Sequence, residues 1–181
     1  RSNVERIEQL PDTTGMRDEF VVQTFHRSAY NQSIRVAGGT LVEIGGEEGA
    51  TKAEIGDSLG SNTAAFLYNI LPISGVWSRG MSLEQVVAIA HDRDVPVVVD
   101  ASAILPPLSN LTDVPEIGAD LVTFSGGKGI EGPQGTGILC GRTELIEAAV
   151  ANAEARYAGL FGKMRMNNDL ESGDAARVES A

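Results

Sequence analysis

The sequence contains a single cysteine, Cys140, so no disulfide can form within the chain. It also lacks any apolar run approaching the roughly 20 residues that a membrane-spanning helix needs. No secretory signal is recognisable, so we expect a reduced, cytoplasmic setting. These absences argue against a disulfide-rich secreted domain and against an integral membrane protein.

Basic residues are scarce as well. Fourteen Lys and Arg residues against 25 Asp and Glu residues give a net charge of −11. This balance disfavours a nucleic-acid partner or an anionic membrane surface, because both bind clustered positive charge. The remaining composition, with 42% hydrophobic residues in 181, suits one soluble domain with its own core, and we expect no bound metal.

Two kinds of segment alternate along the chain. Apolar runs predict strands at residues 19–25, 40–44, 64–70, 95–99, 120–124 and 136–140. Helical spacing predicts helices at residues 30–37, from Thr51 onward, at 83–90 with Ser82 as N-cap, and at 145–157. Strands that alternate with helices predict a three-layer α/β fold with a mostly parallel sheet.

An acidic side chain follows the most continuously apolar of these strands. Residues 95–99 run directly into Asp100. In open parallel sheets, ligands bind at the carboxyl ends of the strands, so this carboxylate could reach a ligand from an apolar surround. An ordinary N-cap or turn aspartate is the alternative interpretation.

A glycine-rich stretch surrounds one lysine. In FSGGKGIEGPQGTGILCG (residues 124–141), Lys128 follows the strand at 120–124 by four residues. Parallel strands would therefore present Lys128 and Asp100 at the same rim of the sheet. A nucleotide phosphate-binding loop is excluded, because Gly129 stands where that motif requires Ser or Thr. A plain glycine-rich turn with a surface lysine remains the alternative.

An amine and a carboxylate directed into one cleft suit pyridoxal phosphate. The lysine would form a Schiff base with the cofactor, and the aspartate would keep the pyridine nitrogen protonated. Ser125 and the neighbouring glycines could offer a hydroxyl and backbone N–H groups to the phosphate. The glycines would also let the backbone approach the cofactor without a Cβ atom in the way.

Three stretches together resemble a known family. VPVVVDASAILPP, GADLVTFSGGKGIEGPQGTGILCGR and HRSAYNQSIRVAGGTLVEIG are similar to the selenocysteine synthase-like and D-glucosaminate-6-phosphate ammonia lyase-like branch of fold-type-I pyridoxal-phosphate enzymes. The resemblance covers roughly residues 5–165. It implies the large domain of the fold-type-I pyridoxal-phosphate-dependent transferase fold.

The resemblance implies cofactor-binding roles for five residues. Lys128 would carry the cofactor and shuttle protons, and Asp100 would pair with the pyridine nitrogen. His26 would stack on the ring, Ser125 would bind the phosphate, and Ser102 would contact the ring oxygen. For His26 and Ser125, a half-buried structural histidine and an ordinary turn serine are the alternatives.

Three further residues are candidates for binding the substrate. Arg27 and Arg79 are the nearest cations for an anionic substrate group, and Gln134 lies in a Gly-Pro-Gln turn near the lysine. The alternatives are a solvated surface arginine for Arg27, a merely packed side chain for Arg79 and an ordinary turn for Gln134.

The sequence departs from the family at both ends. Residues 1–24 contain no equivalent of the loop that binds the cofactor phosphate in the family, and most of the small C-terminal domain is missing. We therefore expect residues 1–166 to be an incomplete large domain, truncated at both ends, and residues 167–181 to be a disordered polar tail. A partner subunit in a homodimer or larger homo-oligomer could complete the site.

The functional hypothesis is a pyridoxal-phosphate-dependent lyase that eliminates ammonia from an amino acid or amino-sugar acid through a Schiff base on Lys128; a phosphorylated sugar acid is implied by the resemblance alone. One alternative is a selenocysteine synthase-like transferase, although the negative charge of the chain counts against a tRNA partner. The other is a truncated domain without catalytic activity, against which the retained Lys128 and Asp100 count.

Overall fold

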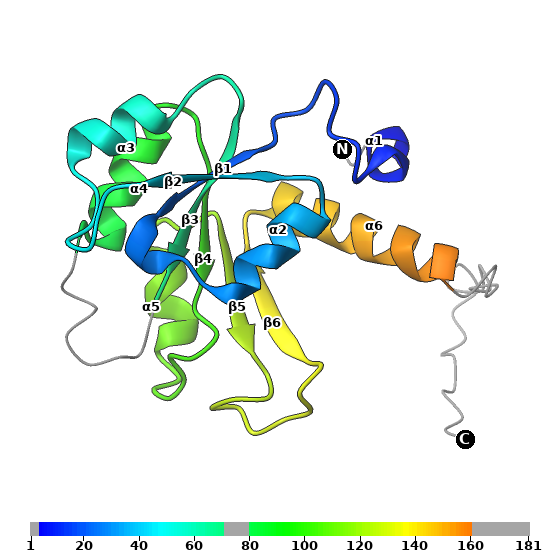
Figure 1. Cartoon of the computed structure of the whole chain (residues 1–181). Coiled ribbons are helices and arrows are strands. Elements are labelled where there is room, and N and C mark those ends of the chain that lie inside the picture. Colours follow the sequence, from blue (N-terminus) through cyan, green and yellow to red (C-terminus); the bar gives the residue numbers. More distant parts are fainter. Residues whose placement is uncertain (1–3, 71–79, 161–181) are drawn as a thin grey trace.

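A computed structural model describes residues 4–70 and 80–160, and Figure 1 shows the fold. Within these residues, six strands form one sheet in the order β2-β1-β3-β4-β5-β6. Neighbouring strands are parallel except for the antiparallel pair of β5 and β6, which confirms the predicted α/β class. The strands are β1 (Glu19–Gln23), β2 (Thr40–Ile44), β3 (Thr63–Asn69), β4 (Val97–Asp100), β5 (Leu121–Ser125) and β6 (Gly137–Gly141).

Helices connect the strands. In the described part of the chain, none of them is long and apolar enough to cross a bilayer. They are α1 (Val4–Gln9), α2 (Gln32–Val36), α3 (Lys52–Ser58), α4 (Leu83–His91), α5 (Asn110–Glu116) and α6 (Thr143–Leu160), with short 3₁₀ turns η1 (Thr24–His26) and η2 (Ala29–Asn31).

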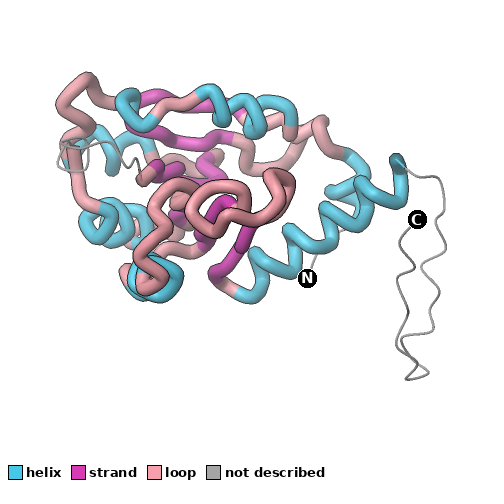
Figure 2. The backbone as a smooth tube through the Cα atoms, turned by 90° about the horizontal axis from the view of Figure 1, so that it is seen from below, coloured by secondary structure: helices cyan, strands magenta, loops and turns pink. Residues whose placement is uncertain are grey.

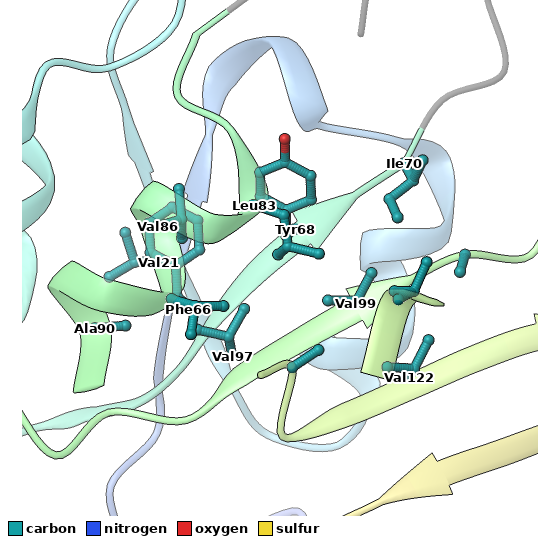
Figure 3. Close-up of a cluster of buried hydrophobic side chains, with 14 of the residues drawn as sticks. Val21, Phe66, Tyr68, Ile70, Leu83, Val86, Ala90, Val97, Val99 and Val122 are labelled. Atoms are coloured by element: carbon teal, nitrogen blue, oxygen red, sulfur yellow. The ribbon is translucent and has the colours of Figure 1, made fainter. Parts of the chain in front are cut away.

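One face of the sheet carries the main hydrophobic core. Phe66 of β3 and Val97 of β4 are fully buried there, and Figure 3 shows them gathered with Val86 and Ala90 of α4. Helices α3 and α5 contribute to the same cluster through residues such as Ile55 and Val114. Burial of a large apolar side chain contributes about 1.5–3 kcal/mol, so this cluster anchors the strands.

The other face of the sheet carries the alternate side chains, because successive residues of a strand point to opposite faces. Val22, Leu67 and Val98 lie there beside Ile34 of α2. The chain passes from β1 outward to β2 and then returns past β1 to β3. Since such crossovers are right-handed, this reversal puts α2 and α3 on opposite faces. The layers are visible end-on in Figure 2.

Two predicted helix starts are confirmed by capping contacts. The Thr51 hydroxyl accepts a hydrogen bond from the Glu54 backbone N–H at 3.2 Å, and the Glu54 carboxylate accepts one from the Thr51 N–H at 2.8 Å. Ser82 and Gln85 make the same reciprocal pair at the start of α4. Each capping box satisfies backbone N–H groups that the first turn of a helix leaves unpaired.

Strand β1 ends two residues earlier than the sequence predicted. The Thr24 hydroxyl lies 3.0 Å from the Ile44 carbonyl oxygen and 2.9 Å from that of Gly45, so it can donate to either. The chain then turns through η1, which contains His26, instead of continuing as a strand. The turn carries His26 beyond the end of β1, to the rim of the sheet.

A cluster of charged side chains lies at the opposite edge of the sheet, where β5 begins. Oδ2 of the buried Asp120 carboxylate accepts a hydrogen bond from the Val97 N–H at 2.7 Å and pairs with His91 at 2.8 Å, and Oδ1 accepts one from Arg142 at 3.1 Å. Burial raises the pKa of Asp120, but the hydrogen bonds from Val97, His91 and Arg142 outweigh burial and hold this pKa below its ordinary 3.8. Asp120 therefore joins α4, β4 and β5 to the segment that begins α6.

Candidate functional site

The candidate site begins with Asp100, the last residue of β4. Asn69 of β3 and Thr123 of β5 flank it in register, so these three residues share one row across the sheet. The row lies at the carboxyl ends of the strands, close to the reversal of strand order between β1 and β3. Ligands of open α/β sheets bind in the crevice that such a reversal creates.

A single hydroxyl links Asp100 to Lys128. The Ser102 backbone N–H donates to Asp100 Oδ1 at 3.0 Å, and the Ser102 hydroxyl also donates to this oxygen. Lys128 Nζ lies 3.4 Å from Ser102 Oγ, in a long hydrogen bond. The structure thus brings together the amine and the carboxylate that the sequence placed at one rim.

His26 lies buried at the same rim, with 4% of its surface exposed. Its ring centroid is 4.1 Å from that of Phe25 and 4.5 Å from that of Tyr68, and its Nδ1 atom has no hydrogen-bond partner among the described residues. Burial lowers the pKa of His26 from 6.5 to about 4, so its ring is neutral near pH 7. A neutral, flat ring suits the predicted stacking role, which stays a prediction.

The low pKa of His26 makes stability depend on pH in a defined window. Unfolding restores the ordinary pKa of the His26 ring, so as the pH falls the unfolded chain binds a proton at this ring before the folded chain does. The free energy of unfolding is therefore lost as the pH falls from 6.5 towards 4. We expect the free energy of unfolding, measured by urea titration, to drop by about 2 to 3 kcal/mol over this window. In His26→Phe this drop should disappear. An equal drop in His26→Phe and in the unchanged chain would contradict the assignment.

Two adjoining cavities open beside His26. One, of about 170 Å³, is lined by both His26 and Asp100, so the predicted ring-stacking and nitrogen-pairing residues face one space. The other, of about 370 Å³, extends towards α4 and α5. His26, Tyr68 and Asn69 line both cavities and form the boundary between them. The site therefore offers a small chamber at the carboxylate and a larger one next to it.

The glycines around Lys128 allow close packing within the protein, while their predicted approach to the cofactor stays a prediction. A Cβ atom on Gly129 would overlap the Leu105 carbonyl, and one on Gly127 would lie 2.6 Å from the side-chain oxygen of Gln134. A Cβ atom on Gly126 would overlap Thr136. These glycines let the loop pack against itself and against Leu105, and this packing fixes the backbone on both sides of the lysine.

Ser125 directly precedes the loop of residues 126–136 between β5 and β6, which we call the lysine loop, and Gln134 lies within it. Ser125 ends β5, opposite Gly137 of β6, two residues after Thr123 on the same face of the sheet. The Gln134 side-chain amide donates to the Gly127 carbonyl at 2.9 Å, so Gln134 supports the loop. Their predicted contacts with cofactor and substrate remain predictions.

The two arginines differ in what the structure offers. The exposed Arg27 forms an ion pair with Glu43 of β2 at 3.3 Å, so binding a substrate anion would require it to exchange partners. Arg79 lies outside the described residues. The substrate-binding roles of both remain predictions.

Residues that the sequence analysis did not single out also reach the site. Tyr30, interpreted from sequence as part of a helical face, lines the smaller cavity, and Lys128 Nζ lies 5.9 Å from the centre of its ring. Asn31, Asn69 and Thr123 add polar groups to the same lining. Asn69 and Thr123 could have been found from the strand ends, because they fall in register with Asp100.

The chain is similar to known proteins over most of its length. The profile of the Aminotransferase class-V family matches residues 13–167. Over 169 residues, 91% of this chain, the sequence is 31% identical to a 5'-C-glycyluridine monooxygenase-decarboxylase from Streptomyces. It is 29% identical over 168 residues to a D-glucosaminate-6-phosphate ammonia lyase from Salmonella typhimurium. L-seryl-tRNA(Sec) selenium transferases also match, one from Desulfovibrio desulfuricans at 28% identity over 83% of this chain and 39% of its own length.

Solved structures show the same relationship. The structure of a D-glucosaminate-6-phosphate ammonia-lyase superposes with a TM-score of 0.74 at 30% identity, covering 84% of this chain and 42% of that one. An aspartate aminotransferase from Thermus thermophilus superposes at 0.58 with 19% identity, over 80% of this chain and 42% of that one, and shows the shared fold.

The chain spans 40% and 43% of the length of the first two curated relatives. The family profile covers residues 13–167, which include the segments that carry His26, Asp100 and Lys128. The chain therefore belongs to the Aminotransferase class-V family, which depends on pyridoxal phosphate.

Proposed function

We propose that this chain forms the cofactor-binding part of a lyase that eliminates ammonia from an amino acid or amino-sugar acid. The observation that carries the proposal is the Ser102 hydroxyl, which joins Lys128 to Asp100 at the rim of the sheet. The likeness to an ammonia lyase, in sequence and at a TM-score of 0.74, supports the reaction type. We further propose that the protein acts in the cytoplasm as a homo-oligomer.

The residues present fit pyridoxal phosphate. The smaller cavity offers the Asp100 carboxylate for a ring nitrogen and the uncharged His26 ring for a ring face. The buried Nδ1 atom of His26, which lacks a partner among the described residues, marks a polar group that a bound molecule could satisfy. Lys128 is exposed beside the same cavity, where a carbonyl group could reach it.

Bound pyridoxal phosphate supplies an electron-accepting ring that stabilises negative charge at the α-carbon of an amino acid. Lys128 Nζ would hold the cofactor and, once the substrate amine has replaced it, remove the α-proton as a general base. Asp100 would keep a proton on the ring nitrogen, and His26 would orient the ring. With a leaving group on the β-carbon, loss of that group followed by hydrolysis gives a keto product and ammonia.

A transferase acting on a tRNA-bound amino acid is the second candidate, favoured by the likeness to L-seryl-tRNA(Sec) selenium transferases at 26% to 29% identity. The net charge of −11 counts against it, because a tRNA-binding surface attracts phosphates through Lys and Arg. We therefore place the lyase first.

Ammonia release tests the proposal. The protein is incubated with pyridoxal phosphate and a panel of amino acids and amino-sugar acids, with and without a phosphate group. Ammonia and the keto product are then measured in parallel. We expect equal amounts of the two from at least one substrate, and neither when the cofactor is omitted. Covalent cofactor binding without ammonia from any of them would contradict the lyase assignment and favour the transferase.

A further inference from the structure

We propose that Tyr30 and Ser102 are positioning residues that hold the Lys128 amine close to Asp100 and Tyr30, which line the smaller cavity, before the cofactor arrives. We call this pair the amine clamp. The inference rests on the proposed role of Lys128 as the cofactor-carrying amine. It assigns Tyr30 a role that the sequence analysis did not give it, and it gives Ser102 a role other than contact with the ring oxygen.

The contribution of Ser102 follows from the donors and acceptors of its hydroxyl group. A serine hydroxyl has one proton to donate and two lone pairs. Its proton is directed to Asp100 Oδ1, so the Lys128 amine, 3.4 Å away, meets a lone pair. The Ser102 backbone N–H donates to the same Asp100 oxygen at 3.0 Å, which fixes the hydroxyl in place. Ser102 is therefore a preorganised acceptor for the amine.

The contribution of Tyr30 comes from a different element. Its ring centre lies 5.9 Å from Lys128 Nζ, within the range of a cation–π contact. The turn η2 that carries Tyr30 is fixed by the Ser28 backbone N–H, which donates to Asn31 Oδ1 at 2.7 Å. The side chain is 74% exposed, so core packing does not explain its position. Tyr30 and Ser102 thus contact the amine from separate parts of the chain.

The amine clamp restricts a side chain that the lysine loop itself leaves mobile. Lys128 stands between Gly127 and Gly129 and is exposed, so its four-carbon stem has little protein around it. The loop packing fixes the backbone but leaves the amine free to rotate. Contacts from Ser102 and Tyr30 limit that rotation and keep Nζ beside Asp100. The amine is then in place for a carbonyl group that enters the cavity lined by Tyr30 and Asp100.

Selective labelling of amines in the cofactor-free chain tests the clamp. A trace of an acetylating reagent is added, and the acetylation rates of Lys128 and of the exposed Lys52 in α3 are compared by peptide mass spectrometry. In Ser102→Ala and in Tyr30→Leu, we expect the ratio of Lys128 to Lys52 labelling to rise about three- to five-fold. In Ser102→Thr and Tyr30→Phe, which keep the hydroxyl and the ring, the ratio should stay as in the unchanged chain.

A second readout is the rate at which pyridoxal phosphate becomes fixed to Lys128 on borohydride reduction. It should fall in Ser102→Ala and Tyr30→Leu by a similar factor. Unchanged labelling ratios in both variants would overturn the clamp, even if the cofactor binds. If the unchanged chain never captures the cofactor, the proposed function fails, and the labelling ratios still decide the clamp. The exposed Tyr30 keeps Tyr30→Leu informative if Ser102→Ala unfolds, which loss of the circular dichroism signal of the helices would reveal.

Discussion

Replacing Lys128 with alanine will abolish covalent capture of pyridoxal phosphate by this chain. The sequence has three lysines, of which the structure describes Lys52 and Lys128, and of these two it is Lys128 whose amine lies 3.4 Å from the Ser102 hydroxyl beside Asp100. An imine to the cofactor requires a primary amine, which alanine cannot supply. The measurement is borohydride reduction followed by peptide mass spectrometry, together with the visible absorption of the mixture.

Lys52→Ala is the matched control for this experiment. Lys52 is exposed at the start of α3, so its removal takes away one amine without changing the candidate site. In Lys52→Ala, we expect one cofactor per chain, attached to the peptide that contains residue 128. In Lys128→Ala, we expect no labelled peptide. Equal labelling of Lys128→Ala and the unchanged chain would show that another amine reacts, and the assignment of Lys128 would be wrong.

A methyl group added at Gly129 will lower the rate of cofactor capture at least about ten-fold. A Cβ atom there would overlap the backbone carbonyl of Leu105, which cannot rotate away, so the lysine loop must move. Overpacking of this kind costs about 1–3 kcal/mol, which is enough to displace the neighbouring Lys128 from Ser102. The capture rate of Gly129→Ala, measured by borohydride trapping, checks this expectation.

Gly135→Ala provides the control within the same loop. A Cβ atom on Gly135 would meet no atom within 4 Å, so the substitution adds the same methyl group in open space. We expect capture by Gly135→Ala to match that of the unchanged chain. If Gly129→Ala also matches it, the contact with Leu105 does not control the position of Lys128, and the packing role of the glycine is refuted.

The sequence was sufficient to predict where the main groups of the site would lie. The run that ends at Asp100 and the strand that precedes Lys128 both predicted parallel strands, and carboxyl ends of parallel strands meet at one rim. The bounds of β4 differ from the prediction, because Asp100 itself pairs with Asn69 and Thr123 and so belongs to the strand. Local patterns were enough here because the strands are buried and strongly apolar.

Other features depend on contacts that no local pattern reveals. The sequence did not predict α5, since this seven-residue helix contains Pro115 and buries only Val114. The use of Gly129 depends on Leu105, 24 positions earlier in the chain. Tyr30 lies near Lys128 only because η2 and the lysine loop meet in space. The roles of Gly129 and Tyr30 depend on contacts between residues far apart in the sequence. The pattern of neighbouring residues therefore carried no signal for them.

The two ends of β5 carry separate groups of charges. Asp120, with His91 and Arg142, holds one end of the strand, whereas the lysine loop begins at the other. Five strand residues span roughly 17 Å, well beyond the screening length of about 8 Å at physiological salt. Surface charge around Asp120 can therefore be redesigned for solubility or heat tolerance while the electrostatic surroundings of Lys128 stay the same.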